Sequence, residues 1–125
     1  MTPSQQAITN TETVLPAHWA DEFNTQLHTD EKLQAWVEID LNTRLHFTRG
    51  LVAITNQRLL ARSPEENQWR AWPLEDGLKL NHLDHAGVGT LELVDDKGRL
   101  ACWRYTLGHN LSALRVIAEF DLHRN

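Results

Sequence analysis

Residues 50–60 read Gly-Leu-Val-Ala-Ile-Thr-Asn-Gln-Arg-Leu-Leu, and this stretch predicts a β-hairpin. Apolar and β-branched residues stand on both sides of a short polar turn, a pattern typical of two paired strands. Val52 and Ile54 are expected to face a core, because every second residue of a strand points to the same side. Arg58 follows the turn and can donate hydrogen bonds to nearby carbonyl groups or to a carboxylate.

Segments with alternating apolar residues extend this hairpin in both directions. Lys32–Leu41 is the clearest of them, and a break at Arg49-Gly50 separates two segments ahead of the turn. Asp95-Asp96-Lys97-Gly98 is the strongest turn in the chain, since Gly98 can adopt a positive φ. The segments expected to supply strands are 32–41, 44–48, 51–55, 58–62, 68–74, 78–85, 90–94 and 99–107. Short strands at hairpin spacing predict an antiparallel meander that curls into a β-sandwich or open barrel.

A first helix is predicted ahead of the strands, over residues 16–28. Trp19 and Phe23 lie on one face of this helix, because residues four apart are neighbours on a helical surface. Residues 1–14 show no periodic apolar pattern, so we expect a flexible N-terminal tail there and a single domain over 15–125.

A second helix is predicted to close the domain. Asn110 is expected as its N-cap, and apolar residues recur at helical spacing from Leu111 to about Leu122. The apolar stripe of this helix has one obvious use, which is to cover an open end of the sheet that would otherwise expose core. The expected fold class is therefore mainly β with helices (α+β): a seven-stranded antiparallel β-sandwich or open barrel with a C-terminal capping helix and an additional N-terminal helix.

This order of elements, together with residues 50–60, resembles the pleckstrin-homology-like (PH-like) superfold in the form used by bacterial and GRAM-type domains. Bacterial PH-like domains often carry a similar Gly-apolar-x-apolar-Thr-Asn-x-Arg-apolar-apolar string across a β-hairpin. The resemblance covers roughly residues 30–122. It implies the capped β-sandwich that the strand and helix patterns also predict.

Further strings resemble the N-terminal cytosolic extension of certain bacterial ABC exporters, which are fused permease–ATPase chains associated with cyanophycin metabolism. These strings are Leu15–Trp19, Asp40-Leu41, Asp84–Leu93 and Trp103–Thr106. The resemblance implies a regulatory domain that contacts the transporter's own membrane and ATPase domains. The sequence holds no transmembrane segment and no Gly-x-x-x-x-Gly-Lys-Ser/Thr string, so we expect no ATP hydrolysis and no transport from it.

Length and charge narrow the class of protein further. The chain has 125 residues, the size of one ordinary domain. Acidic residues outnumber basic ones by 17 to 12, and the formal net charge of −5 argues against binding to nucleic acid. The single cysteine, Cys102, cannot form an internal disulfide and favours a reducing compartment. The N-terminus has no secretion signal, so we expect a cytoplasmic domain, either free or tethered to the inner membrane as part of a longer chain.

The residues that could carry chemistry lack the spacing that chemistry needs. His82 and His85 lie three apart at a strand end, where they face opposite sides, and no Cys or further carboxylate completes a metal site with them. Cys102 lies in a predicted strand without a neighbouring base, as a small buried hydrophobe would. We therefore expect no catalytic residue, no cofactor-binding residue and no metal ligand. An enzyme on the same scaffold, with a cleft that the sequence does not disclose, is left as an alternative.

Lipid binding is a second alternative. Phosphoinositide-binding PH domains place several Lys and Arg residues in and beside their first hairpin, and the corresponding segment here is 40–49. Arg44 and Arg49 are its lipid-headgroup candidates, offset by the nearby carboxylates of Glu38 and Asp40. Solvated hairpin charges are the competing interpretation of these arginines.

The five tryptophans supply the best candidates for a protein interface. Trp36 lies opposite the apolar face of its strand, and Trp69 and Trp72 have opposite parity, so at least one of the latter points outward. An outward aromatic residue beside Arg70 is the kind of anchor that interfaces use, although the first helix could instead pack over it. The resulting hypothesis is a non-catalytic docking domain of an ABC exporter that binds protein through Trp36, Trp69, Arg70 and Trp72. Its expected partner is the rest of the transporter or a second copy, with no nucleic acid, no metal and only indirect membrane contact.

Overall fold

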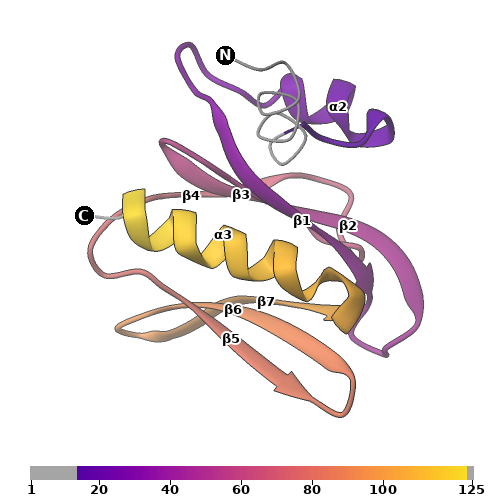
Figure 1. Ribbon diagram of the computed structural model, residues 1–125. Helices are drawn as coiled ribbons and strands as arrows, with labels where there is room; N and C mark the ends of the chain where they lie inside the picture. Colours follow the sequence, from indigo (N-terminus) through magenta and orange to yellow (C-terminus); the bar gives the residue numbers. More distant parts are fainter. Residues whose placement is uncertain (1–13, 124–125) are drawn as a thin grey trace, which may run out of the picture.

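A computed structural model describes residues 14–123 and contains one antiparallel sheet with seven strands and two helices (Figure 1). The elements are α2 (Ala17–Asn24), β1 (Leu33–Leu41), β2 (Phe47–Thr55), β3 (Arg58–Arg62), β4 (Arg70–Pro73), β5 (Lys79–His85), β6 (Val88–Asp95), β7 (Gly98–Thr106), the 3₁₀ turn η1 (Leu107–His109) and α3 (Asn110–His123). The predicted class, mainly β with an N-terminal and a C-terminal helix, is confirmed. The predicted flexible tail lies, except for Val14, outside the described residues.

The sheet consists of two meanders that meet at one point. The strand order is β4-β3-β2-β1-β7-β6-β5, so neighbouring strands are consecutive in sequence except for β1 and β7, and β4 and β5 lie at opposite edges. That junction is a single registered pair, Leu41 with Arg104. Figure 1 shows α3 lying across the two meanders, β1–β4 and β5–β7. The closing helix therefore covers the core between them, as its apolar pattern predicts.

The main core lies beneath α3. Ala113, Val116 and Phe120 of this helix are fully buried and pack against inward-facing residues of both meanders. The strand members of this core include Val37, Ile39, Val52, Ile54, Leu59, Leu91, Leu93, Trp103 and Tyr105. Val52 and Ile54 thus face the core as predicted.

A second, smaller core lies on the opposite face of β1–β3. Trp19 and Phe23 of α2 are buried there against Leu51, Ala53 and Leu60. Because β2 is covered on both faces, all its residues from Gly50 to Thr55 are buried. This double burial explains why residues 50–54 form an uninterrupted apolar run instead of alternating with polar residues.

The predicted break at Arg49-Gly50 is wrong. Residues 47–55 form one strand, and Gly50 pairs with Ile39 within it. A Cβ at position 50 would lie 2.8 Å from the Arg62 carbonyl oxygen and 2.8 Å from Pro64 Cδ. Gly50 is therefore needed for a close approach of two chain segments and does not end a strand.

Three other predicted boundaries need correction. The first helix ends at Asn24, not at residue 28, because the following residues turn back toward β1. Asn110 is not an N-cap, since its φ of −61° and ψ of −41° continue the helical path from η1. Strand β6 begins at Val88, because Ala86 and Gly87, with φ of 53° and 84°, form the turn of a tight hairpin.

Candidate functional site

The four residues predicted as a protein interface divide between the two faces of the sheet. Trp36 and Trp69 pack against the small core beneath α2. Trp72 packs instead against the main core, and the Arg70 guanidinium lies 4.7 Å from the centre of its ring. The structure therefore brings Arg70 and Trp72 into contact and places Trp36 and Trp69 on the other face. The use of these four residues as an interface stays a prediction.

Trp69 packs against α2 and holds it on the sheet. Its ring meets Trp19 and Phe23 edge-on, with ring centres 6.1 Å and 5.8 Å apart. Its indole N–H donates a 2.9 Å hydrogen bond to Glu22 Oε2, which also accepts from Arg62 Nε at 3.1 Å. The competing interpretation, that the first helix packs over an outward tryptophan, describes Trp69 well.

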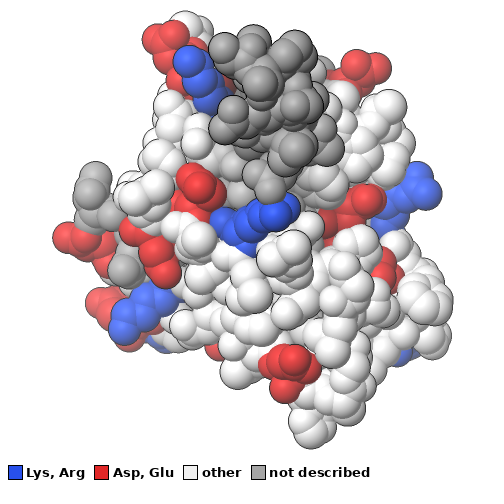
Figure 2. Space-filling model, in the orientation of Figure 1, with Lys and Arg blue, Asp and Glu red and all other residues white. Residues whose placement is uncertain are grey.

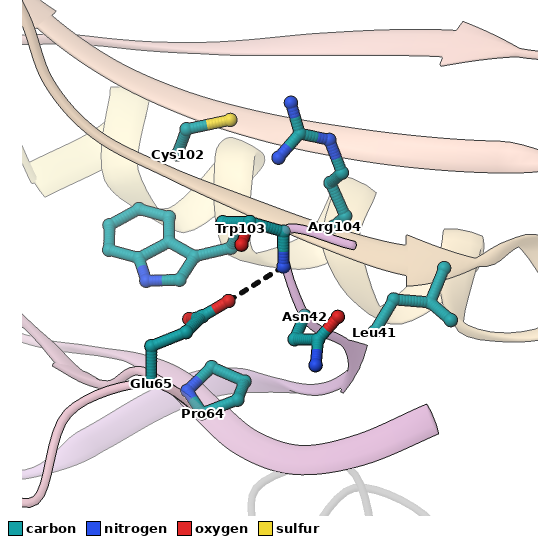
Figure 3. Close-up of a pocket in the computed structure, with 8 residues that line it drawn as sticks. Leu41, Asn42, Pro64, Glu65, Cys102, Trp103 and Arg104 are labelled. Carbon is teal, nitrogen blue, oxygen red and sulfur yellow. Dashed lines mark hydrogen bonds between the residues drawn. The ribbon is translucent and has the colours of Figure 1, made fainter. Parts of the chain in front are cut away.

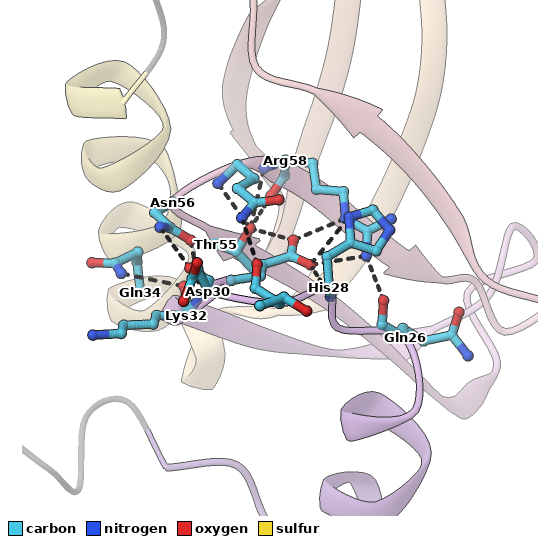
Figure 4. A network of polar contacts seen from close by, with 11 residues as sticks. Gln26, His28, Asp30, Lys32, Gln34, Thr55, Asn56 and Arg58 are labelled. Carbon is cyan, nitrogen blue, oxygen red and sulfur yellow. Dashed lines mark hydrogen bonds and ion pairs between the residues drawn. The ribbon is translucent and has the colours of Figure 1, made fainter.

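A polar network ties the start of β1 to the β2–β3 turn (Figure 4). The Glu31 carboxylate is buried and receives two hydrogen bonds from Arg58, Nε to Oε2 at 2.8 Å and Nη2 to Oε1 at 2.9 Å. The Thr55 hydroxyl and the His28 backbone N–H donate to the same carboxylate at 2.7 Å and 2.9 Å. Arg58 also donates to the Gln26 carbonyl. The prediction that Arg58 binds carbonyl groups or a carboxylate is confirmed for both.

This network fixes the charge of Glu31. Burial by itself raises the pKa of a carboxyl group, but the hydrogen bonds from Arg58, His28 and Thr55 and the Arg58 charge outweigh it and lower the pKa of Glu31 to about 2. All four of its donors belong to the fold, so the group is a structural anchor without an open side for a substrate.

The lipid-headgroup candidates lie on or near the tip of the β1–β2 hairpin. The Asn42 side-chain oxygen accepts hydrogen bonds from the backbone N–H groups of Arg44 and His46, which shapes the tip. Arg44 and Arg49 are both exposed. The same tip exposes two large apolar side chains, Leu45 (50%) and Phe47 (82%).

These two apolar residues are functional candidates that the sequence did not reveal. The alternating pattern predicted a strand over residues 44–48, and one face of that strand was expected to be buried. Leu45 instead adopts a φ of 62°, an uncommon left-handed conformation for such a side chain, and breaks the pattern. A shallow groove of about 280 Å³ runs beside it and is lined by Leu45, His85, Ala86, Val88, Thr90 and Arg104.

The hollow between the β1–β2 and β3–β4 loops is nearly filled (Figure 3). Glu65 Oε2 accepts a 2.6 Å hydrogen bond from the Thr43 backbone N–H, and the Trp103 indole donates to Ser63 Oγ at 2.9 Å. The remaining volume is about 10 Å³, room for about one water. Cys102 is one of its lining residues and is half-buried.

His82 belongs to a second structural polar group, at the start of α3. Its Nε2 lies 2.8 Å from the Asn110 side-chain oxygen, and its ring stacks on Tyr105. Burial, and the negative charge of Asp84, raise the pKa of Tyr105 to about 12. Within residues 14–123, no group of three or more His, Cys, Asp and Glu side chains is placed to hold a metal ion.

The outer face of α3 carries a row of exposed apolar residues. Leu111, Leu114 and Leu122 are 61%, 43% and 71% exposed, and Ala118 between them is also exposed. We call these four residues the α3 stripe. Because residues three and four apart share a helical face, the stripe lies on one side of α3, opposite the residues that enter the main core. The apolar pattern of this helix predicted a single core-facing stripe, so this second apolar face is a finding of the structure.

Comparisons with protein-family models, with curated proteins and with solved structures found no match for this chain. No helix within residues 14–123 has both the length and the apolar character needed to cross a bilayer.

Proposed function

We propose that this chain is a non-catalytic PH-like docking domain that acts through protein–protein contacts. The strand order and the capping helix support the PH-like part, because two meanders closed by a C-terminal helix are the arrangement that the resemblance implies. The string over residues 50–60 also spans the β2–β3 hairpin, as it does in that resemblance. Fold alone does not define a function, so the docking part needs an observation of its own.

The α3 stripe is that observation. Scattered exposed apolar residues are normal on a protein surface, whereas several on one helical face mark a contact surface. Figure 2, in the orientation of Figure 1, shows uncharged surface interspersed with charged groups of both signs on this face of the molecule. In contrast, Glu31 and Tyr105, the groups with displaced pKa values among residues 14–123, are engaged within the fold. Arg70 and Trp72, at the edge strand β4, stay candidates for a further contact.

The expected result for docking is a loss of bound protein when charges enter the stripe. A tagged chain carrying both Leu111→Glu and Leu114→Glu should retain at most about a tenth of the protein that the native chain co-purifies, because a charge in the centre of an interface is strongly unfavourable. Leu83→Glu is the matched control, since Leu83 is 56% exposed on β5, outside the stripe. Equal co-purification by all three chains would contradict docking through α3.

We further propose that the domain is the N-terminal regulatory extension of a bacterial ABC exporter in the cytoplasm. The support is the set of strings quoted above, which fall on α2, β1, β5–β6 and β7. Reading the native gene beyond codon 125 tests this directly. A frame that continues into about six apolar spans of the length that membrane helices need, followed by a phosphate-binding loop, supports the proposal. A stop codon after Asn125 would remove it and leave a free-standing docking domain.

A second candidate function, binding to an anionic lipid surface, is favoured by the β1–β2 tip. Phe47 and Leu45 are exposed beside Arg44, while the Glu65 carboxylate accepts a hydrogen bond from the Thr43 backbone N–H at the base of the same tip. Exposed apolar side chains next to cations are the features that bind a membrane interface. Cosedimentation with phosphatidylglycerol vesicles at low salt should then fall at least about fivefold in an Arg44→Ala/Arg49→Ala variant, since each cation near the surface contributes about 1 kcal/mol.

The matched control for this lipid experiment removes two exposed cations elsewhere. Lys97 and Arg99 lie at the β6–β7 turn, so Lys97→Ala/Arg99→Ala changes the net charge equally and should leave vesicle binding unchanged. Absence of vesicle binding by the native chain at low salt would contradict the proposal that the domain binds an anionic lipid surface.

A further inference from the structure

We propose that the α3 stripe packs against the α3 stripe of a second copy of this chain, with the two helices antiparallel. This inference rests on the proposed docking function and names the partner. A two-fold dimer needs a surface that complements itself. The 14 residues of α3 span about 21 Å, and Ala118, near the middle of the stripe, allows two helix axes to approach closely.

The charges beside the stripe favour the antiparallel orientation. Arg115 and Glu119 lie one turn apart on the same flank of the stripe. When two helices cross antiparallel about a two-fold axis near Ile117, Arg115 of each copy comes opposite Glu119 of the other. A parallel pair would set the same charges against the opposite flank, where Leu114 and the exposed Asp121 lie, and would bring Glu119 of one copy beside Asp121 of the other. Only the antiparallel pair therefore forms two opposite-charge contacts.

Glu119 is held in place for such a contact. Its Oε1 lies 3.3 Å from His123 Nε2, one turn further along the helix. Both side chains are about one-third exposed, so the carboxylate stays at the surface of α3 and can accept a further donor. Each such contact at an exposed rim adds little affinity but selects the orientation of the partner.

The size of the stripe predicts a weak dimer. Stable interfaces bury roughly 1,200–2,000 Å² in total, and a single pair of short helices offers less. We expect an equilibrium between monomer and dimer that depends on concentration. The free chain should be monomeric when dilute, and a longer polypeptide that holds two copies together would strengthen the contact through its effective concentration.

Sedimentation equilibrium of the purified chain from about 1 μM to about 1 mM tests the inference, because this range spans weak dissociation constants. The native chain should pass from monomer to dimer. Leu114→Glu should raise the dissociation constant at least about tenfold, as expected for a central apolar residue. Leu83→Glu should leave it unchanged. Circular dichroism and thermal melting of each variant establish that the fold is intact.

A charge exchange tests the orientation. Arg115→Glu alone and Glu119→Arg alone should each raise the dissociation constant a few-fold, because both create like-charge pairs across the two-fold axis. The double variant, Arg115→Glu with Glu119→Arg, should restore native affinity. A native chain that stays monomeric throughout, an unaffected Leu114→Glu dimer, or no rescue by the double variant would each overturn the inference. The native chain could be monomeric while substitutions in the stripe still abolish co-purification of a different protein. That result would support docking through α3 and contradict self-association.

Discussion

Replacing Arg58 with methionine should destabilise the fold by about 3–5 kcal/mol, the usual effect of removing one partner from a buried ion pair. The substitution leaves the Glu31 carboxylate, whose side chain is 0% exposed, without its two-pronged donor. It also removes the link from Arg58 to the Gln26 carbonyl, so the connection between α2 and β1 loosens. Urea unfolding at neutral pH measures the loss directly.

Two control variants distinguish the effect of breaking the buried ion pair from the effect of removing a surface charge. Arg58→Lys keeps the charge but not the planar fork, so its stability should lie between those of the native chain and Arg58→Met. Arg99→Met removes an exposed pair, Arg99 Nη1 to Glu92 at 3.4 Å, and should change stability by less than about 1 kcal/mol. Similar losses in Arg58→Met and Arg99→Met would contradict the anchor role of the Glu31 network.

The pH dependence of stability tests whether the unpaired Glu31 carboxylate causes the loss of stability in Arg58→Met. In the native chain the pKa of Glu31 is lowered from 4.5 to about 2, so its contribution is complete above pH 4.5 and disappears as the pH falls from there through 2. In Arg58→Met the buried carboxyl group has lost its cation, and burial then raises its pKa, so it takes up a proton more readily. The stability difference between the two chains should therefore narrow on acidification toward pH 3. A difference that stays constant with pH would show that lost packing, and not the carboxylate, causes the effect.

Replacing Gly89 with alanine should destabilise the fold by about 2–4 kcal/mol, because the new methyl group has no space. A Cβ at this position would lie 2.3 Å from Tyr105 Cε2 and 2.4 Å from Cζ. Gly89 and Tyr105 are registered partners on β6 and β7, and the tyrosine ring is fully buried over the glycine. A shift of the ring would also disturb its contacts with His82 and Asn110. Thermal or urea unfolding gives the size of the loss.

The matched control is Gly77→Ala, since a Cβ there meets no atom within 4 Å. Its effect on the free energy of unfolding should be within about 0.5 kcal/mol. Tyr105→Leu supplies a second check, because a smaller side chain relieves the clash. The double variant Gly89→Ala/Tyr105→Leu should then lose clearly less stability than the sum of the two single variants. Additive losses would contradict a direct clash between the two positions.

Local patterns in the sequence predicted most of the fold. The hairpin over residues 50–60, the alternating β1 and the closing helix depend on near neighbours, so their residue types are sufficient to predict them. The break at Gly50 was mispredicted because its cause, the close approach of Arg62 and Pro64, is a contact between segments distant in the chain. The length of the first helix was overestimated because Gln26 and His28 bind the Glu31–Arg58 group instead of continuing the helix.

The candidate sites were less predictable than the fold. Strand parity shows that Trp69 and Trp72 face opposite sides, but it does not show that α2 covers one of those sides. The partner of Arg58 is 27 residues away in the chain, so its residue type could be anticipated and its identity could not. The α3 stripe was hidden because apolar residues on two faces of one helix produce no single amphipathic pattern.

The most direct test of the docking proposal is photo-crosslinking in the native host from inside the α3 stripe. If the docking proposal is correct and a protein covers the stripe, a photoreactive phenylalanine analogue at Leu114 should form covalent adducts with that protein. The same analogue at Asp96, an exposed residue of the β6–β7 turn and outside the stripe, should form few. An adduct of twice the chain mass identifies a second copy, and any other protein adduct identifies a different partner. Equal and sparse labelling at both positions would contradict the proposal that this domain docks to protein through α3.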